Sequence, residues 1–239
     1  METARTHNPV YALLKRCQNS IRKQKGEKER KSVITVLCNC IIYNNINGLI
    51  SKQDSLVDIL NMRKPDLIAL CETKLHVNST FEIKGYKVVK SNLKAGKEGI
   101  LVAAKEGTYN KIELIYEADS KQLATVEINY PNNNIRLTVV HGPQEDADIE
   151  EREEFYVDLH AELQRGLESQ CQVLLVGDFN ARLVHEEGQL QESQGNGKRL
   201  KEVVEKFNLN VLNIQPSTEG KWKKSRRKAA YNVNQKSIV

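Results

Sequence analysis

The 239-residue sequence lacks any run approaching the roughly 18 apolar residues that a membrane-spanning helix needs. Its first residues also lack the order of basic, apolar and small residues that defines a secretory signal. Together these absences predict a protein that is neither secreted nor membrane-bound. We expect it inside the cell, in the nucleus, the cytoplasm or both.

Cysteines are too few and too scattered to form a disulfide framework. The sequence contains five, an odd number, and most of them lie within apolar runs. This usage predicts reduced thiols in an intracellular compartment. Cys38 and Cys40 form a Cys-x-Cys pair with no second pair elsewhere, which argues against a structural zinc site.

The net charge of +5 hides an uneven distribution. Residues 1–31 carry nine Lys or Arg and three Glu, and residues 221–239 carry seven Lys or Arg and no acid. The two ends therefore contribute +6 and +7, which leaves −8 for the stretch between them. Basic segments bind polyanions because each phosphate contact releases counterions. A solvated loop or a nuclear-import signal has the same composition, so the charge favours a nucleic acid partner only mildly.

No internal repeat or low-complexity linker divides the body of the chain, and we expect one mixed α/β domain over residues 32–239. The residues before it, 1–31, are expected to be a flexible basic extension with a short helix at residues 11–17. Apolar residues at helical spacing predict helices over residues 54–63, 148–168 and 198–209. Runs of β-branched residues bounded by turn signals predict strands over residues 32–44, 64–72, 85–91, 98–104, 111–117, 122–130, 134–142, 172–180 and 210–214.

Three of the predicted strands end in acids and amides. CIIYNNIN ends in Asn45 and Asn47, LIALCE ends in Glu72, and VLLVGDFN ends in Asp178 and Asn180. Side chains alternate along a strand, so residues two apart point to the same side. If the three strand ends converge, they form one site with two carboxylates and up to three amides.

Such a set favours a metal-assisted reaction over nucleophilic catalysis, which needs an activated serine or cysteine. Mg²⁺ takes one or two carboxylates and keeps several waters for a substrate phosphate. Glu72 would hold the ion, Asp178 would orient a water or take its proton, and the amides would donate to phosphoryl oxygens. Any one of these residues alone is better explained as a turn former. The three strand ends together favour the site.

Five segments also carry a resemblance to a known family: YNNINGL, DLIALCETKL, VVHGPQEDADIEEREEFY, LLVGDFNARL and GNGKRLKEVVEKFNLNVLN. In this order they resemble the endonuclease/exonuclease/phosphatase family, and most of all the endonuclease domains of non-LTR (LINE-type) retrotransposons and their domesticated relatives. The resemblance covers about residues 33–239. It implies a four-layer α/β/β/α sandwich of the deoxyribonuclease I type. It also implies Mg²⁺-dependent phosphate ester hydrolysis, with Mn²⁺ as an alternative ion, DNA as the partner and no small-molecule cofactor.

The resemblance assigns roles to four residues of the expected site. Glu72 matches the family's metal-binding glutamate, and Asn45 matches the asparagine that opens the first motif, with a part in metal binding and catalysis. Asp178 matches the aspartate that aligns the attacking water. Asn180 matches the amide beside it that contacts the scissile phosphate.

Three further residues are expected on the substrate side. Asn47 shares its strand end with Asn45, and Asn196 in GNG matches a substrate-side asparagine of the family. His141 stands just before a Gly-Pro, where the family usually has a tyrosine. A histidine can donate a hydrogen bond to phosphate and titrates near neutral pH, so we predict a catalytic role for it. A ring that caps a loop is the alternative.

The sequence ends at Val239, after a segment that resembles the lead-in to the family's penultimate motif. Residues 1–239 do not contain the family's final motif with its Asp-His pair. We therefore expect a C-terminally truncated domain without its last strands, with uncovered apolar sheet surface and weak or no hydrolysis.

The sequence is compatible with three functions. The first is a Mg²⁺-dependent DNA endonuclease of the retrotransposon lineage, which the motifs favour most. The second is a phosphatase or sphingomyelinase-like hydrolase, because the same fold hosts these reactions. The third is a catalytically inactive module that binds DNA or a protein. The sequence determines neither the DNA target nor the oligomeric state.

Overall fold

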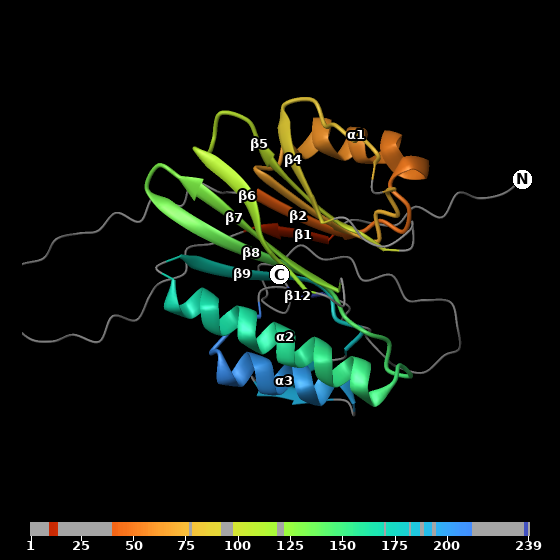
Figure 1. Ribbon diagram of the computed structural model, residues 1–239, viewed down its shortest axis with the longest axis vertical. Helices are drawn as coiled ribbons and strands as arrows, with labels where there is room; N and C mark the ends of the chain where they lie inside the picture. Colours follow the sequence, from red (N-terminus) through yellow and green to blue (C-terminus); the bar gives the residue numbers. More distant parts are fainter. Residues whose placement is uncertain are drawn as a thin grey trace, which may run out of the picture.

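The computed structural model describes residues 10–13, 40–76, 78–91, 98–118, 122–169, 171–181, 183–186, 189–192, 195–211 and 237–238. Within these ranges two β-sheets pack face to face, and helices cover the outer face of each sheet (Figure 1). The predicted four-layer α/β/β/α sandwich is therefore confirmed.

The first sheet has the strand order β1-β2-β3-β5-β4. Its strands are β1 (Val10–Leu13), β2 (Cys40–Asn45), β3 (Leu67–Cys71), β4 (Tyr86–Ser91) and β5 (Ile100–Lys105). Only β2 and β3 run parallel to each other. The 3₁₀ turn η1 (Ile50–Lys52) and helix α1 (Gln53–Arg63) form the crossover between them. Leu56 and Leu60 of α1 share an apolar cluster with Ile68 and Leu101 of the sheet.

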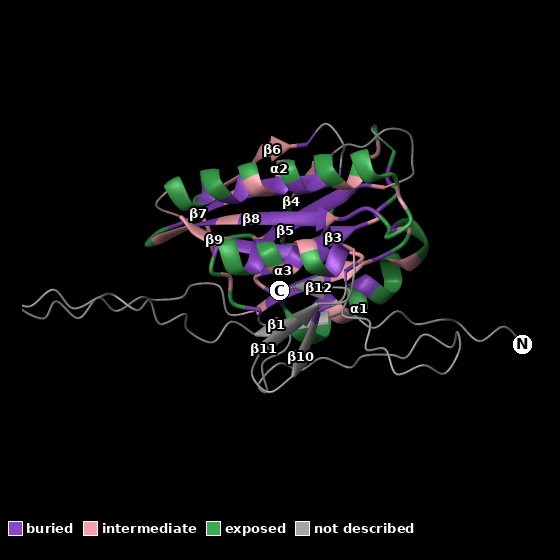
Figure 2. Cartoon of the chain, turned by 90° about the horizontal axis from the view of Figure 1, so that it is seen from below, coloured by how far each residue is buried: buried purple, intermediate pink, exposed green. Residues whose placement is uncertain are grey.

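The second sheet has the order β12-β9-β8-β7-β6, and only β8 and β9 are parallel. Its strands are β6 (Lys111–Glu117), β7 (Leu123–Tyr130), β8 (Asn133–His141), β9 (Gln172–Asp178) and β12 (Ser237–Ile238). Helices α2 (Ile149–Glu168) and α3 (Asn196–Lys206) lie side by side over its outer face, with their own outer faces exposed (Figure 2). Strands β10 (Leu183–Glu186) and β11 (Gln189–Glu192) form a separate hairpin.

The main core lies between the sheets and is built from alternate residues of their central strands. Ile41, Leu67 and Val102 contribute from the first sheet, and Val126 and Leu137 contribute from the second. All are almost completely buried. Because both faces of β3 are covered, every residue of that strand is buried, which explains its uninterrupted apolar sequence.

Most predicted elements match the structure within one or two residues. The third helix begins at Asn196, two residues before its predicted start, and ends at Lys206. The short helix predicted at residues 11–17 was wrong for its first three residues, because these extend along the edge of β2 and form backbone hydrogen bonds there. The strand predicted at residues 210–214 is not formed at Asn210 and Val211, and its remainder lies outside the described residues.

No helix in the described ranges is long and apolar enough to cross a membrane.

A buried charged network fixes α2 to the second sheet. Glu162 of α2 is 1% exposed and accepts hydrogen bonds from Arg136 of β8 at 2.7 Å and from Arg165 at 2.9 Å. The Arg165 guanidinium also stacks 4.4 Å from the ring centre of Tyr116 on β6. One carboxylate therefore pairs with two guanidinium groups at the boundary between the helix and the sheet.

Removal of this carboxylate should cost more stability than removal of an exposed one. We expect Glu162→Ala to lower the free energy of unfolding by about 3–5 kcal/mol, because Arg136 would remain buried without its partner. Urea denaturation measures this difference. Glu154→Ala, an exposed glutamate on the same helix, is the control and should change stability by less than about 0.5 kcal/mol. Equal effects of the two substitutions would contradict the assigned role of the network.

Candidate active site

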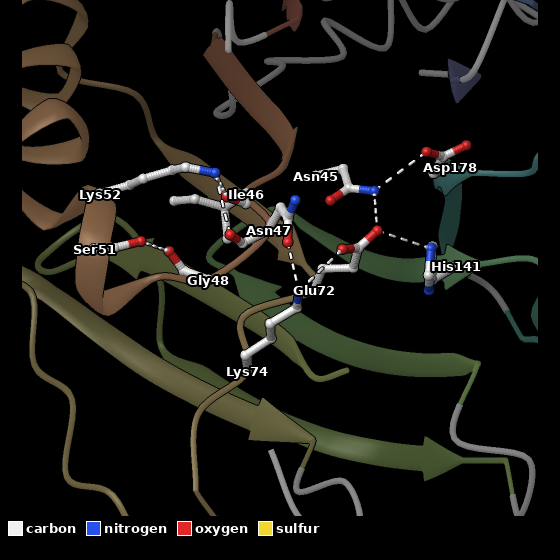
Figure 3. A network of polar contacts seen from close by, with 10 residues as sticks. All are labelled: Asn45, Ile46, Asn47, Gly48, Ser51, Lys52, Glu72, Lys74, His141 and Asp178. Atoms are coloured by element: carbon white, nitrogen blue, oxygen red, sulfur yellow. Dashed lines mark hydrogen bonds and ion pairs between the residues drawn. The ribbon is translucent and has the colours of Figure 1, made fainter. Parts of the chain in front are cut away.

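Four strand ends, two from each sheet, meet at one edge of the sandwich. Asn45 ends β2, Glu72 follows β3, His141 ends β8 and Asp178 ends β9. Cys71 pairs with Asn45 in the parallel β2–β3 ladder, and His141 pairs with Asp178 in the parallel β8–β9 ladder. Parallel neighbours have their carboxyl ends on the same edge, so each sheet delivers two side chains to this point (Figure 3).

The amide of Asn45 connects the two carboxylates. Its Nδ2 donates to Glu72 Oε1 at 2.6 Å and to Asp178 Oδ2 at 3.3 Å. Because both bonds end at one nitrogen, the two carboxylate oxygens lie within about 6 Å of each other. His141 Nε2 lies 3.2 Å from the same Glu72 oxygen. The convergence expected from the strand ends is thus present for Asn45, Glu72 and Asp178, and His141 of β8 joins them.

These contacts control the ionisation of Glu72 and His141. The hydrogen bond from His141 lowers the pKa of Glu72 to about 2, against the opposing effect of burial and with further help from Asn45. Burial lowers the pKa of His141, but its contact with Glu72 outweighs burial, and the net pKa of the imidazole is raised. Glu72 is therefore a carboxylate at neutral pH, in contact with a histidine that is mostly buried.

Backbone strain is concentrated at the same edge. Six non-glycine residues in the described ranges have positive φ, and four of them belong to this region. They are Asn47 (46°), Glu72 (51°), Lys74 (53°) and Asn180 (44°). Such conformations cost on the order of 1–3 kcal/mol each and persist only where the surroundings enforce them. The strain indicates that this edge is specialised for function.

Backbone hydrogen bonds hold the strained segments in place. Gly48 N donates to Glu72 O at 2.8 Å, and Lys74 N donates to Glu98 O at 2.8 Å.

On the other sheet, a Cβ at Gly177 would lie 2.2 Å from Val140 O, so no larger residue fits directly before Asp178 without a shift of the backbone. The glycine of GDFN therefore allows β9 to pack closely against β8.

The asparagines Asn180 and Asn196, from the fourth and fifth motifs, hold loops together. Asn180 N donates to Asp178 Oδ1 at 3.2 Å, and Asn180 Nδ2 donates to Gly142 O at 2.8 Å. Asn196 is 0% exposed, and its Nδ2 donates to Pro143 O at 2.9 Å and to Asn180 O at 3.3 Å. Asn196 thus positions the loop that contains Asn180. The substrate contacts expected of these two residues stay predictions.

Two lysines that the sequence analysis did not single out lie beside the carboxylates. Lys74 Nζ donates to Asn47 Oδ1 and lies 4.0 Å from Glu72 Oε2. Lys52 Nζ donates to Asn47 O at 3.1 Å and to Ile46 O. Lys74 follows Glu72 by two residues, and this spacing could have indicated that Lys74 lies at the site. Lys52 is brought there by the η1 turn. Asn47 is exposed and lies between these two cations, so its substrate role stays a prediction.

Beneath the site, a buried pair joins the neighbouring strands β2 and β3 of the first sheet. Tyr43 Oη and Cys71 Sγ lie 2.9 Å apart, and both side chains are at most 2% exposed. Tyr43 precedes Asn45 by two residues on β2, and Cys71 directly precedes Glu72. Burial raises the pKa of the Cys71 thiol, and hydrogen bonds from Tyr43 and, to a smaller extent, from the Asp178 backbone partly oppose this rise. The thiol therefore serves as a neutral packing group where β2, β3 and β9 meet.

The side chains present fit a divalent ion that is held by few protein ligands. The described residues contain no group of three or more His, Cys, Asp or Glu side chains arranged around one point. They do contain the ionised Glu72 and, beside it, Asn45 Oδ1, a buried oxygen with no hydrogen-bond partner in the described structure. A buried carbonyl oxygen without a partner is costly, and a cation would satisfy it. Mg²⁺ is commonly bound in this way, with water or substrate in its remaining positions.

Comparison with known families identifies the class of protein. The model of the endonuclease/exonuclease/phosphatase family matches residues 45–231, which is more than half of the chain. The chain therefore belongs to the endonuclease/exonuclease/phosphatase family, a family of phosphate ester hydrolases. Among curated protein sequences, none matches the chain significantly.

Solved structures confirm the fold. The AP endonuclease LMAP from Leishmania major superposes with a TM-score of 0.58 at 15% identity, over 72% of this chain and 68% of that one. An AP endonuclease from Archaeoglobus fulgidus gives 0.54 at 19% identity, over 69% of each chain. The 3'-5' exonuclease NExo from Neisseria meningitidis gives 0.50 at 18% identity, and this chain spans only 57% of its length. At these identities the similarity establishes the deoxyribonuclease I-like fold alone.

The depressed pKa of Glu72 predicts a pH-dependent contribution to stability. Its folded-state pKa of about 2 lies below the ordinary 4.5, so the stabilisation is fully present above about pH 4.5 and is lost as the pH falls towards 2. We expect the stability advantage of wild type over Glu72→Gln to shrink over this interval in urea denaturation. The exposed Glu154→Gln is the control and should show no such trend. A constant difference between wild type and Glu72→Gln would contradict the depressed pKa.

The buried position of Cys71 predicts slow alkylation. Cys71 is 0% exposed, whereas Cys40 and Cys171 are partly exposed. Burial raises the pKa of both Cys71 and Cys40, so exposure is what distinguishes these two thiols. In native protein treated with iodoacetamide, Cys40 and Cys171 should therefore be modified well before Cys71, and urea should abolish the difference. Peptide mass spectrometry resolves the sites. Rapid native modification of Cys71 would show that the contact between the sheets opens.

Proposed function

We propose that this chain is a divalent-metal-dependent phosphodiesterase that cleaves DNA as an endonuclease. The observation that carries the proposal is the contact of Asn45 with both Glu72 and Asp178, which joins an ion-binding carboxylate to a second carboxylate from the other sheet. A metal ligand and a proton acceptor within about 6 Å of each other form the minimal arrangement for metal-assisted hydrolysis of a phosphate ester.

Glu72 and the Oδ1 atom of Asn45 are the residues that would hold the ion. Glu72 is ionised at any physiological pH, because its pKa is lowered to about 2 by His141 and Asn45. When bound, the ion supplies a Lewis acid that neutralises charge on the phosphoryl oxygens. Asp178 does not need to bind the ion, since hydrogen bonds already hold both of its oxygens, Oδ2 from Asn45 and Oδ1 from the Asn180 backbone.

Asp178 is the group that would orient the attacking water and accept its proton. It is 5% exposed and is held at both oxygens, Oδ2 by Asn45 and Oδ1 by the backbone N–H of Asn180. A carboxylate fixed in this way can hold a water in one direction without loss of side-chain entropy during the reaction. Lys52 and Lys74 lie next to Glu72 and would attract the phosphates of a bound strand.

Two features of the sequence favour DNA as the substrate, namely its basic ends and its five motifs. The two basic ends of the sequence, +6 over residues 1–31 and +7 over residues 221–239, suit a long polyanion better than a small phosphomonoester. The order and the residues of the five sequence motifs support common ancestry with the endonuclease domains of non-LTR retrotransposons. A DNA substrate also supports the nucleus or cytoplasm as the place of action.

The proposal predicts nicking of supercoiled plasmid that depends on a divalent ion and on Asp178. With protein in excess over plasmid, so that slow turnover is detected, we expect Mg²⁺-dependent conversion to open circles that EDTA stops. Asp178→Ala should lower the rate at least about 100-fold, because the proton acceptor is lost.

The exposed Asp54→Asn on α1 is the matched control and should nick at the wild-type rate. Nicking that persists in Asp178→Ala or in EDTA would refute the assigned mechanism. Salt-sensitive DNA binding without any cleavage would instead support a binding module.

A further inference from the structure

We propose that His141 is a direct nitrogen ligand of the bound ion, and that this site therefore selects Mn²⁺ over Mg²⁺. The inference rests on the metal-assisted function proposed above. It differs from that function in naming a ligand and an ion, and ion binding can be measured without DNA.

The first observation is the distance between the donor atoms. Two neighbouring ligands of an octahedral ion, each about 2.1 Å from it, lie about 3 Å apart. His141 Nε2 and Glu72 Oε1 are 3.2 Å apart. An ion bound to this oxygen of Glu72 can therefore also contact the imidazole nitrogen with hardly any movement of either side chain.

The second observation is the crowding around one oxygen. Glu72 Oε1 receives both His141 Nε2 and Asn45 Nδ2, whereas Asn45 Oδ1 is buried without a partner among the described residues. Reversal of the Asn45 amide would present Oδ1 to the position that Nδ2 now fills. It would exchange the Nδ2 bonds to Glu72 and Asp178 for the ion, and Asp178 would keep its bond from the Asn180 backbone. A neutral imidazole would present its lone pair there in the same way. Glu72, Asn45 and His141 can thus become three ligands without movement of the backbone.

The third observation is the way in which His141 is held. His141 is the last residue of β8, its backbone N donates to Gln122 O at 2.8 Å, and its side chain is only 15% exposed. The ring is therefore fixed by a strand and not by a loop. A fixed nitrogen donor costs little entropy when it binds an ion.

The preference of the site for one ion over another follows from the chemical type of its donor atoms. Carboxylate and amide oxygens suit Mg²⁺, Ca²⁺ and Mn²⁺ alike, whereas imidazole nitrogen suits the first-row transition metals. Mg²⁺ has a strong preference for oxygen and water. Mn²⁺ accepts both kinds of donor, so a ligand set of one carboxylate, one amide and one imidazole favours Mn²⁺.

Electron spin echo envelope modulation of Mn²⁺-loaded, tag-free protein tests the ligand directly. We expect ¹⁴N modulation from a coordinated imidazole, and its replacement by ¹⁵N modulation when the protein is labelled with ¹⁵N-histidine. His141→Phe should abolish this signal. His160→Gln is the matched control, since His160 lies on α2 beside Lys206 and Phe207, and its substitution should leave the signal intact.

Isothermal titration calorimetry tests the selectivity. Wild type should bind Mn²⁺ at least about tenfold more tightly than Mg²⁺, and His141→Tyr, which replaces the nitrogen donor by a phenol, should lose most of that preference. Circular dichroism verifies that each variant is folded.

Mn²⁺ binding without a histidine-derived nitrogen signal in wild type would overturn the inference, even if His141→Phe failed to fold. That result would leave the proposed function standing, since Glu72 and Asn45 could still bind the ion. Failure of Mn²⁺ to bind at all would overturn the inference too, and the plasmid assay with Mg²⁺ would then decide the proposed function separately.

Discussion

The amide nitrogen of Asn45 is the point on which the site depends. It donates to Glu72 from the neighbouring strand and to Asp178 from the opposite sheet. Two carboxylates this close would repel each other without a donor or a cation between them. The amide therefore holds them in the arrangement that a bound ion would otherwise have to create. Its own oxygen is left buried without a partner in the described structure, which is the cost of this arrangement.

The sheets bring these residues together through their two parallel strand pairs. Most neighbours in both sheets are antiparallel, but β2–β3 and β8–β9 are parallel, and their carboxyl ends meet at one edge. Directly beneath, Tyr43 and Cys71 are buried between the sheets. Above them, the backbone at Glu72 and Asn180 is in the left-handed region. A rigid base with strained ends is typical of sites in which the direction of a side chain matters more than local stability.

The sequence analysis predicted the layers and most elements because their signals are local. Alternating or continuous apolar runs of five to nine residues correspond to buried strands such as β3 and β8. The β10–β11 hairpin was missed because LVHE and QLQE have little β-branched character. The site was predicted only on the condition that the strand ends converge. Lys52 was not predicted, because the η1 turn brings it to Asn47 and no spacing in the sequence indicates this contact.

The sequence by itself determined which side chains stand at the ends of strands and, through its motifs, the family to which the chain belongs. Only the tertiary structure decided how these side chains are used. It placed Asn196 in the interior, where its amide supports the Asn180 loop, and it placed the imidazole of His141 against Glu72. The physical reason is that a strand fixes the face on which a side chain lies, whereas its partners come from other strands, and their distances depend on how two sheets twist and pack.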